Sequence, residues 1–181
     1  MQRPTHRIAL TASFAALAVA AGFVEQIPNI EIITMTIFLC GQLLGAASGG
    51  IAGAVAAFLF STLNPYGLPG PVLLAAQIFS MAMAGIVGGS VKVGSPLSTR
   101  SRLTLALCGF LLTVMYDLLT TASFTLLVDL DWRGLVTTVI VGVWFYVVHT
   151  VSNTLIFAFI LPILIQRLSQ LRLFAAVTST S

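Results

Sequence analysis

Polar and apolar positions along the chain separate into long apolar runs and short polar connections. Six runs are apolar enough to be helices that cross a membrane: about 8–24, 31–47, 48–63, 71–91, 103–128 and 135–165. Most of these lengths lie near the roughly 20 residues that a spanning helix needs. The runs do not alternate polar and apolar residues, so the pattern predicts helices and not the strands of a barrel.

The connections predict how neighbouring runs are joined. Only the small residues 45–50 separate the second run from the third, so we expect a tight helical hairpin, with one interrupted helix as the alternative. Residues 64–71, Asn-Pro-Tyr-Gly-Leu-Pro-Gly-Pro, combine fixed proline dihedrals with permissive glycines and predict an ordered external turn. This turn is either a plain connector or a rim whose Asn64 and Tyr66 contact a ligand from outside.

Composition indicates the same class of protein. With 58% hydrophobic and only 7% charged residues, the chain exceeds what a soluble core needs. The first run has no clear small-x-small cleavage site after it, so we expect a retained helix and not a signal peptide. We expect Cys40 and Cys108 to be small packing residues and not a disulfide or a metal pair. The predicted fold is an all-α integral membrane protein, a compact six-transmembrane-helix bundle forming a single membrane domain over residues 1–181.

The basic residues predict an orientation. In a six-helix topology, seven of the 8 basic residues fall on one side of the membrane: Arg3, Arg7, Lys92, Arg100, Arg102, Arg167 and Arg172. The positive-inside rule makes that side cytoplasmic, so both termini should be cytoplasmic. Because these residues flank separate membrane segments, the net charge of +3 does not call for a nucleic-acid partner.

Two ionisable residues, Asp117 and His149, lie well inside apolar runs. An aspartate near the centre of a spanning helix costs about 2.5 to 3.5 kcal/mol on insertion scales, so Asp117 should have a partner. The predicted helices place both residues roughly 15 to 20 Å below the outer surface, where they can meet. Tyr146 and Asn153 share a helix face with His149. Other polar or aromatic side chains near this layer are Gln42, Gln77, Tyr116 and Trp144.

Three interpretations of this layer remain open. Asp117 forms a structural contact between helices with His149 or Asn153, or the group is the polar floor of an outward pocket, or it is a proton relay. As a pocket, its aromatic rings, amides and carboxylate–imidazole pair suit a flat, partly apolar ring compound. We expect Glu25 and Glu31 to be solvated helix-end groups at the external rim, with a site for a cation or a metal as the alternative.

The sequence contains no catalytic motif that we can identify. It has no Gly-x-x-x-x-Gly-Lys-Ser loop, no His-Glu-x-x-His, no Cys-x-x-Cys and no intramembrane nucleophile with an evident base. We therefore expect a protein that is not an enzyme and that has neither a cofactor nor a bound metal. If ATP drives its function, another subunit must hydrolyse it.

Small residues recur at helix-packing intervals. Ala9, Ala12, Ala16 and Ala20 form a ridge at spacings of three and four on the first predicted helix. Such a ridge lets another helix approach closely, either inside the bundle or outside it. Close helix crossings are also indicated by the glycines at Gly41, Gly45, Gly49, Gly53, Gly85, Gly88 and Gly89.

These features together resemble the substrate-binding S component of energy-coupling factor (ECF) transporters. The resemblance is carried by Ala12-x-x-x-Ala16-x-x-x-Ala20, the Asn64-Pro65-Tyr66-Gly67 turn and six short helices with both ends inside. The segment from Asn29-Ile30-Glu31 to Gly67 is similar to unassigned and vitamin-type members. It carries no signature of the riboflavin, thiamine, biotin, folate or cobalamin branches, so no particular substrate follows.

The resemblance implies a function. Such a component captures a vitamin or related micronutrient from outside and delivers it through a transmembrane coupling subunit and two ATPase subunits in a prokaryotic cell membrane. It assigns partner docking to Ala12, Ala16 and Ala20. It assigns substrate binding to Asn64, Tyr66, Gln77, Tyr116, Asp117, Trp144, Tyr146, His149 and Asn153. Two alternatives remain: a solitary proton-coupled secondary carrier in which Asp117 or His149 binds the coupling proton, and a noncatalytic membrane scaffold subunit.

Overall fold

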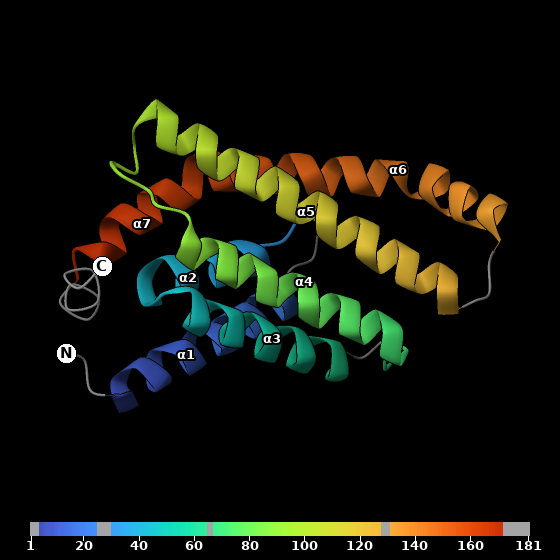
Figure 1. The fold of residues 1–181 in the computed structure, drawn as a ribbon, viewed down its shortest axis with the longest axis horizontal. Helices are drawn as coiled ribbons and strands as arrows, with labels where there is room; N and C mark the ends of the chain where they lie inside the picture. The colour runs from blue at the N-terminus through green and yellow to red at the C-terminus, as the bar shows by residue number, and fades with distance from the viewer. Residues whose placement is uncertain (1–3, 25–29, 65–66, 128–130, 172–181) are drawn as a thin grey trace.

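The computed structural model describes residues 4–24, 30–64, 67–127 and 131–171, and every element in these ranges is helical (Figure 1). The elements are α1 (Pro4–Val24), α2 (Ile33–Leu44), α3 (Ala46–Thr62), α4 (Pro71–Ser90), α5 (Thr99–Leu127), α6 (Trp132–Leu155), η1 (Ile156–Ile160) and α7 (Leu161–Ser169). The π-helical turn η1 joins α6 and α7 without a break. Within the described ranges the chain therefore forms six helical stretches, and the all-α prediction is confirmed.

A single glycine divides the second predicted run from the third. Gly45 has a φ of 89°, which an L side chain rarely adopts, and its amide donates to the Gly41 carbonyl at the end of α2. The next helix begins at once, and α2 and α3 pack against each other. The expected helical hairpin is confirmed, and a single interrupted helix is excluded.

The helices differ in length in a way that shapes the interior. Among the described residues, four stretches are long and apolar enough to cross a membrane, as in multi-pass membrane proteins: Thr5–Val24, Pro71–Ser90, Thr99–Leu126 and Trp132–Ser169. In contrast, α2 has 12 residues. At 1.5 Å per residue it is roughly 18 Å long, well short of the roughly 30 Å of a bilayer's hydrocarbon core. Helix α2 alone therefore cannot cross this core, and its first residues, Ile33 and Thr34, are buried in the bundle.

Glycines bring α3 and α4 into backbone contact. A Cβ added at Gly85 would collide with the backbone of Gly49, and one added at Gly53 would collide with the Met81 carbonyl. The glycine pattern thus correctly predicted close helix crossings. Gln42 on α2 strengthens the same region, because its amide nitrogen donates to the carbonyls of Gly88 and Val91 over 2.6 and 2.7 Å at the end of α4.

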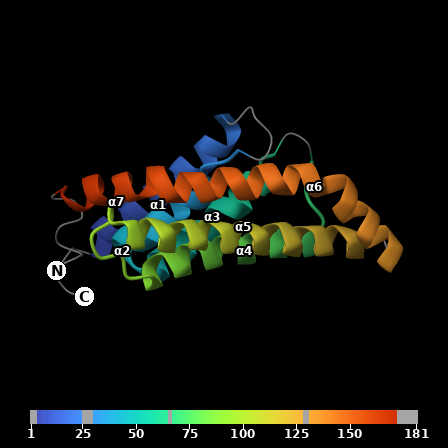
Figure 2. The same ribbon diagram turned by 90° about the horizontal axis from the view of Figure 1, so that it is seen from above.

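The long α6–η1–α7 stretch runs beside α5, and α5 also packs on α4 (Figures 1 and 2). The start of α1, the end of α7 and the connection from α4 to α5 lie at one end of the bundle (Figure 1). The end of α3, the start of α4, the end of α5 and the start of α6 lie at the other end (Figure 1). The outer faces of α5 and α6 are apolar and exposed, as at Leu118, Ile140 and Val141, which suits contact with lipid.

Helix α1 packs on α2 and α3 with one face only. Phe14, Ala15 and Ala18 are buried, whereas Ala12, Ala16 and Ala20 are exposed. The small-residue ridge therefore faces away from the bundle. Arg7 fixes the start of α1, because its guanidinium donates to the Ser48 hydroxyl over 2.8 Å and to the Leu44 carbonyl over 2.7 Å.

Candidate functional site

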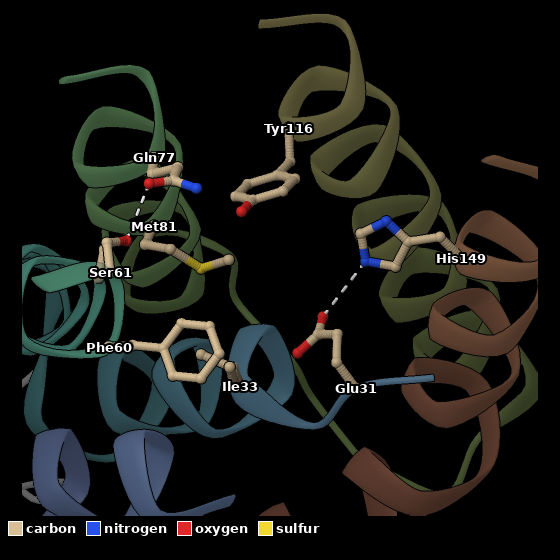
Figure 3. Close-up of a pocket in the computed structure, with 9 residues that line it drawn as sticks. Glu31, Ile33, Phe60, Ser61, Gln77, Met81, Tyr116 and His149 are labelled. Atoms are coloured by element: carbon tan, nitrogen blue, oxygen red, sulfur yellow. Dashed lines mark hydrogen bonds and ion pairs between the residues drawn. The ribbon is translucent and has the colours of Figure 1, made fainter. Parts of the chain in front are cut away.

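A cavity of about 200 Å³ lies between α3, α4, α5, α6 and the segment before α2 (Figure 3). Ser61 stands next to the end of α3, and Gln77 lies in the second turn of α4. The cavity is thus in the half of the bundle that contains the end of α3 and the start of α4. Its walls are formed by Glu31, Ile33, Ala57, Phe60, Ser61, Gln77, Met81, Tyr116 and His149.

Glu31 is the acidic group of this cavity. Its side chain is only 13% exposed. One carboxylate oxygen accepts the Thr34 amide over 2.8 Å in the first turn of α2, and the other accepts the Asn153 amide group over 2.7 Å. The expectation that Glu31 is a solvated rim group is therefore wrong, because α2 is short and begins inside the bundle. Glu25, interpreted in the same way, lies outside the described residues.

The imidazole of His149 lies between two carboxylates. Its Nδ1 is 2.8 Å from Asp117 Oδ1, and its Nε2 is 3.7 Å from Glu31 Oε1 (Figure 3 shows the Glu31 side). An ionised Asp117 only accepts, so Nδ1–H donates to it. Nε2 then either offers a lone pair or, in the imidazolium, a second N–H. Three buried atoms of this group have no hydrogen-bond partner among the described residues: His149 Nε2, Asp117 Oδ2 and Asn153 Oδ1.

Asp117 and Asn153 lie behind the cavity wall. The Asn153 amide also donates to the Thr113 hydroxyl over 3.0 Å, and Asn153 is fully buried. These contacts tie α5 to α6, as the interpretation of a structural contact between helices requires. His149 takes part in that contact and also lines the cavity. A structural role and a binding role are thus compatible at this one residue.

Two further predicted residues line the cavity. The Gln77 carbonyl oxygen accepts from the Ser61 hydroxyl over 2.8 Å, and its amide nitrogen points into the cavity (Figure 3). The ring of Tyr116 meets the His149 ring edge to face, with centroids 6.0 Å apart. Gln77, Tyr116 and His149 are therefore brought together by three different helices.

Other predicted residues do not line the cavity. Trp144 is 69% exposed. It precedes His149 by five positions on α6, which turns its side chain about 140° around the helix axis from that of His149. The Tyr146 hydroxyl is 2.7 Å from the Thr121 hydroxyl and is used between helices. Asn64 lies at the end of α3 outside the cavity wall, and Tyr66 lies outside the described residues.

Sequence reasoning missed much of the wall. Phe60, Ser61 and Met81 lie in apolar helices where nothing distinguishes them from lipid-facing or packing residues. The position of Glu31 inside the bundle could have been predicted from the sequence. Gly45 ends the second run early, so a helix that stops there is too short to carry Glu31 to the surface.

The cavity is lined by a mixture of polar and apolar side chains. In the described parts of the chain, no group of three or more His, Cys, Asp or Glu side chains has an arrangement that could hold a metal. The cavity instead combines one carboxylate, one imidazole, one amide and one phenol with the apolar surfaces of Ile33, Phe60 and Met81. Such a mixture binds small organic molecules, where apolar contact gives affinity and polar groups give orientation.

Comparisons with protein-family models, curated proteins and solved structures found no match to this chain. Its function is therefore inferred from the geometry of the cavity and the surface of the bundle.

Proposed function

We propose that this protein is the substrate-binding S component of an ECF-type importer in a prokaryotic cell membrane. It captures a vitamin or a related micronutrient from outside and delivers it through a separate coupling and ATPase module. The observation that carries the proposal is the cavity itself, a polar chamber within an apolar bundle. Buried polar groups in a membrane are costly and mark functional sites, particularly where their partners are incomplete, as at His149 Nε2.

The size of the cavity limits the substrate. At roughly 30 Å³ per water molecule, about 200 Å³ holds on the order of seven waters. This lies below the roughly 300 to 1,000 Å³ typical of drug-sized ligands, so the substrate, or the part of it that is enclosed, is small. Phe60 and Tyr116 offer ring faces and edges, and Gln77 and Glu31 offer directed polar contacts. A compact ring compound with hydrogen-bonding substituents fits this surface.

The ridge on α1 supports the second part of the proposal. Ala12, Ala16 and Ala20 are exposed while the opposite face of the helix is buried in the bundle. Exposed small residues in a row permit close approach of a helix from another subunit, where packing drives association in lipid. We assign this ridge to docking on the transmembrane coupling subunit, which carries two ATPase subunits. The positively charged end of the bundle then faces the cytoplasm, with both termini.

The contacts among Glu31, His149 and Asp117 favour one alternative, a solitary proton-coupled carrier. The Glu31–His149–Asp117 series provides three neighbouring groups that can exchange protons. Uptake by such a carrier would collapse with an uncoupler and persist after ATP depletion. Uptake by the proposed importer would need ATP and the partner subunits. If changes in the cavity altered stability but no small molecule bound, a scaffold subunit would be the better description.

Partner capture tests the importer directly. The tagged protein is co-expressed with the coupling subunit and ATPases of its own organism and purified in mild detergent. We expect all three partners to co-purify with wild type and to be lost from Ala16→Trp, because the indole separates the two helices. Leu111→Trp on α5 is the control, since Leu111 is exposed and already large. Retention of the partners by Ala16→Trp would contradict docking through the ridge.

A further inference from the structure

The cavity has an excess of negative charge. Glu31 and Asp117 each contribute a formal negative charge, and His149 between them is either neutral or carries one positive charge. Of the residues described as lining the cavity, none is a lysine or an arginine. The formal charge of this cluster is about −2 when the imidazole is neutral and about −1 when it is an imidazolium. A buried net charge is expensive unless a counter-charge accompanies it.

The hydrogen bonds to Glu31 do not supply that counter-charge. Its partners Thr34 and Asn153 are neutral donors. They orient the carboxylate and hold it in the cavity wall, but they leave its charge unbalanced. The cationic form nearest to Glu31 among the described residues is an imidazolium at His149, whose Nδ1–H is directed at Asp117 and whose Nε2 lies 3.7 Å from Glu31 Oε1.

The second observation is an unused polar atom beside Glu31. His149 is only 7% exposed, it lines the cavity, and its Nε2 has no hydrogen-bond partner among the described residues. The 3.7 Å between Nε2 and Glu31 Oε1 is too long for a hydrogen bond. In Figure 3 a dashed line joins these two atoms beside the cavity, and Nε2 itself is buried. In the neutral form of His149 that this inference requires, Nδ1–H is directed at Asp117, and Nε2 and Glu31 Oε1 are two adjacent acceptors without a shared donor among the described residues.

We propose that the substrate of this cavity is a small organic cation, whose protonated amine, amidine or ring nitrogen donates to Glu31 and to His149 Nε2. This inference depends on the proposed function, in that it takes the cavity to be the substrate site. The ring of the substrate packs near Phe60 and Tyr116, whose aromatic faces also attract a cation. Gln77 then orients the uncharged end through its amide nitrogen, which points into the cavity in Figure 3.

Three probes of nearly equal shape test the charge requirement: benzamidinium, benzamide and benzoate. Their affinities for the purified full-length protein are measured by titration calorimetry and thermal shift. We expect benzamidinium to bind at least about tenfold more tightly than benzamide, as a charge-assisted hydrogen bond predicts, and benzoate to bind most weakly. In Glu31→Gln the preference for benzamidinium over benzamide should largely disappear.

Two further variants secure the result. Asp131→Asn removes a carboxylate far from the cavity, and an asparagine there can still accept the Gly134 amide at the start of α6, so the preference should be unchanged. Gln77→Glu retains an acceptor for Ser61 and adds a negative charge to the cavity, so the preference for benzamidinium should increase. This second variant keeps the test decisive if Glu31→Gln does not fold.

The outcomes separate the two proposals. If benzamide or benzoate binds as tightly as benzamidinium, or if Gln77→Glu does not raise the preference, the substrate is not a cation. The cavity then remains a binding site for a neutral or anionic compound, and the proposed function stands. If none of the three probes binds at millimolar concentration, the charge inference is overturned together with the ligand-binding role of the cavity.

Discussion

The two halves of the bundle are held together by different means. Helices α2, α3 and α4 approach through glycines until backbone meets backbone, as at Gly49 and Gly85. Helices α5 and α6 are joined by polar side chains, with Asp117 bonded to His149 and Tyr146 bonded to Thr121. In lipid, where apolar association gains little, both kinds of contact stabilise helix pairs. Of the buried polar atoms without a hydrogen-bond partner in the described residues, three lie in the second group, on Asp117, His149 and Asn153.

The cavity lies at the boundary between these halves. The glycine-packed half supplies apolar walls such as Phe60 and Met81, and the polar half supplies Tyr116 and His149. Glu31 crosses the boundary, since it precedes α2 and yet accepts from Asn153 on α6. A closely packed half and a polar half thus enclose the cavity together. Substitutions in the two halves should therefore have different consequences.

The largest loss of stability is expected in the glycine-packed half. Gly85→Ala places a methyl group against the Gly49 backbone, which cannot move without separating α3 from α4. We expect a loss of about 1 to 3 kcal/mol or more, as for overpacked cores. Gly94→Ala is the matched control, because nothing lies within 4 Å of its added Cβ. Equal thermal unfolding temperatures for the two variants in detergent would show that the close crossing is not needed.

A somewhat smaller loss of stability is expected when the hydrogen bond from Asn153 to Glu31, which crosses this boundary, is removed. Asn153→Leu eliminates the donor to Glu31 and to Thr113 and leaves buried acceptors unpaired. The expected cost is about 1 to 3 kcal/mol. Thr154→Val is the control, since the Thr154 hydroxyl donates to the Thr150 carbonyl of its own helix. Chemical unfolding curves of the two variants should differ, and identical curves would remove Asn153 from the contact.

Two tyrosines in the polar half separate stability from binding. Tyr146→Phe removes the hydroxyl beside Thr121 and should cost about 1 kcal/mol of stability without changing ligand affinity. Tyr116→Phe alters the cavity wall and should weaken a ligand that bonds to the phenol, with a smaller change in stability. Thermal unfolding with and without ligand measures both effects. The opposite assignment, with binding lost only in Tyr146→Phe, would move the site elsewhere.

The smallest effect is expected at the outer surface of α6. Trp144 is 69% exposed and does not line the cavity. Trp144→Ala should change the free energy of unfolding in detergent by no more than about 0.5 kcal/mol, as for most surface substitutions. Ligand affinity should remain that of wild type. A marked loss of affinity would place Trp144 at the site, as the sequence resemblance suggested.

The apolar pattern was sufficient to predict the helices. All six predicted runs correspond to helical stretches, and the small residues around Gly45 correctly predicted the break between α2 and α3. The pairing of Asp117 with His149 was also accessible, because equal depth on consecutive helices brings two residues together. Both inferences depend on local properties, namely hydropathy, helical rise and turn chemistry.

The cavity wall was less accessible because it depends on how helices rotate and tilt against one another. Phe60 and Met81 have the same apolar character as exposed residues on their helices. In a helix that is apolar on all sides, the alternation of polar and apolar positions does not show which face is buried. Glu31 was misplaced because residues 31–47 were treated as one full span. The position of a helix end in the membrane is set by its tertiary contacts, here the bond from Asn153, and not by hydropathy.

The most direct test of the binding role is mass spectrometry of small molecules released from the protein after purification in mild detergent. Ala57→Phe serves as the comparison, since Ala57 is buried in the cavity wall and a phenyl ring there fills the space. We expect wild type to release one defined small molecule that is missing from an equally monodisperse Ala57→Phe sample. Release of no compound from wild type, or of the same compounds from both, would contradict a substrate site in this cavity.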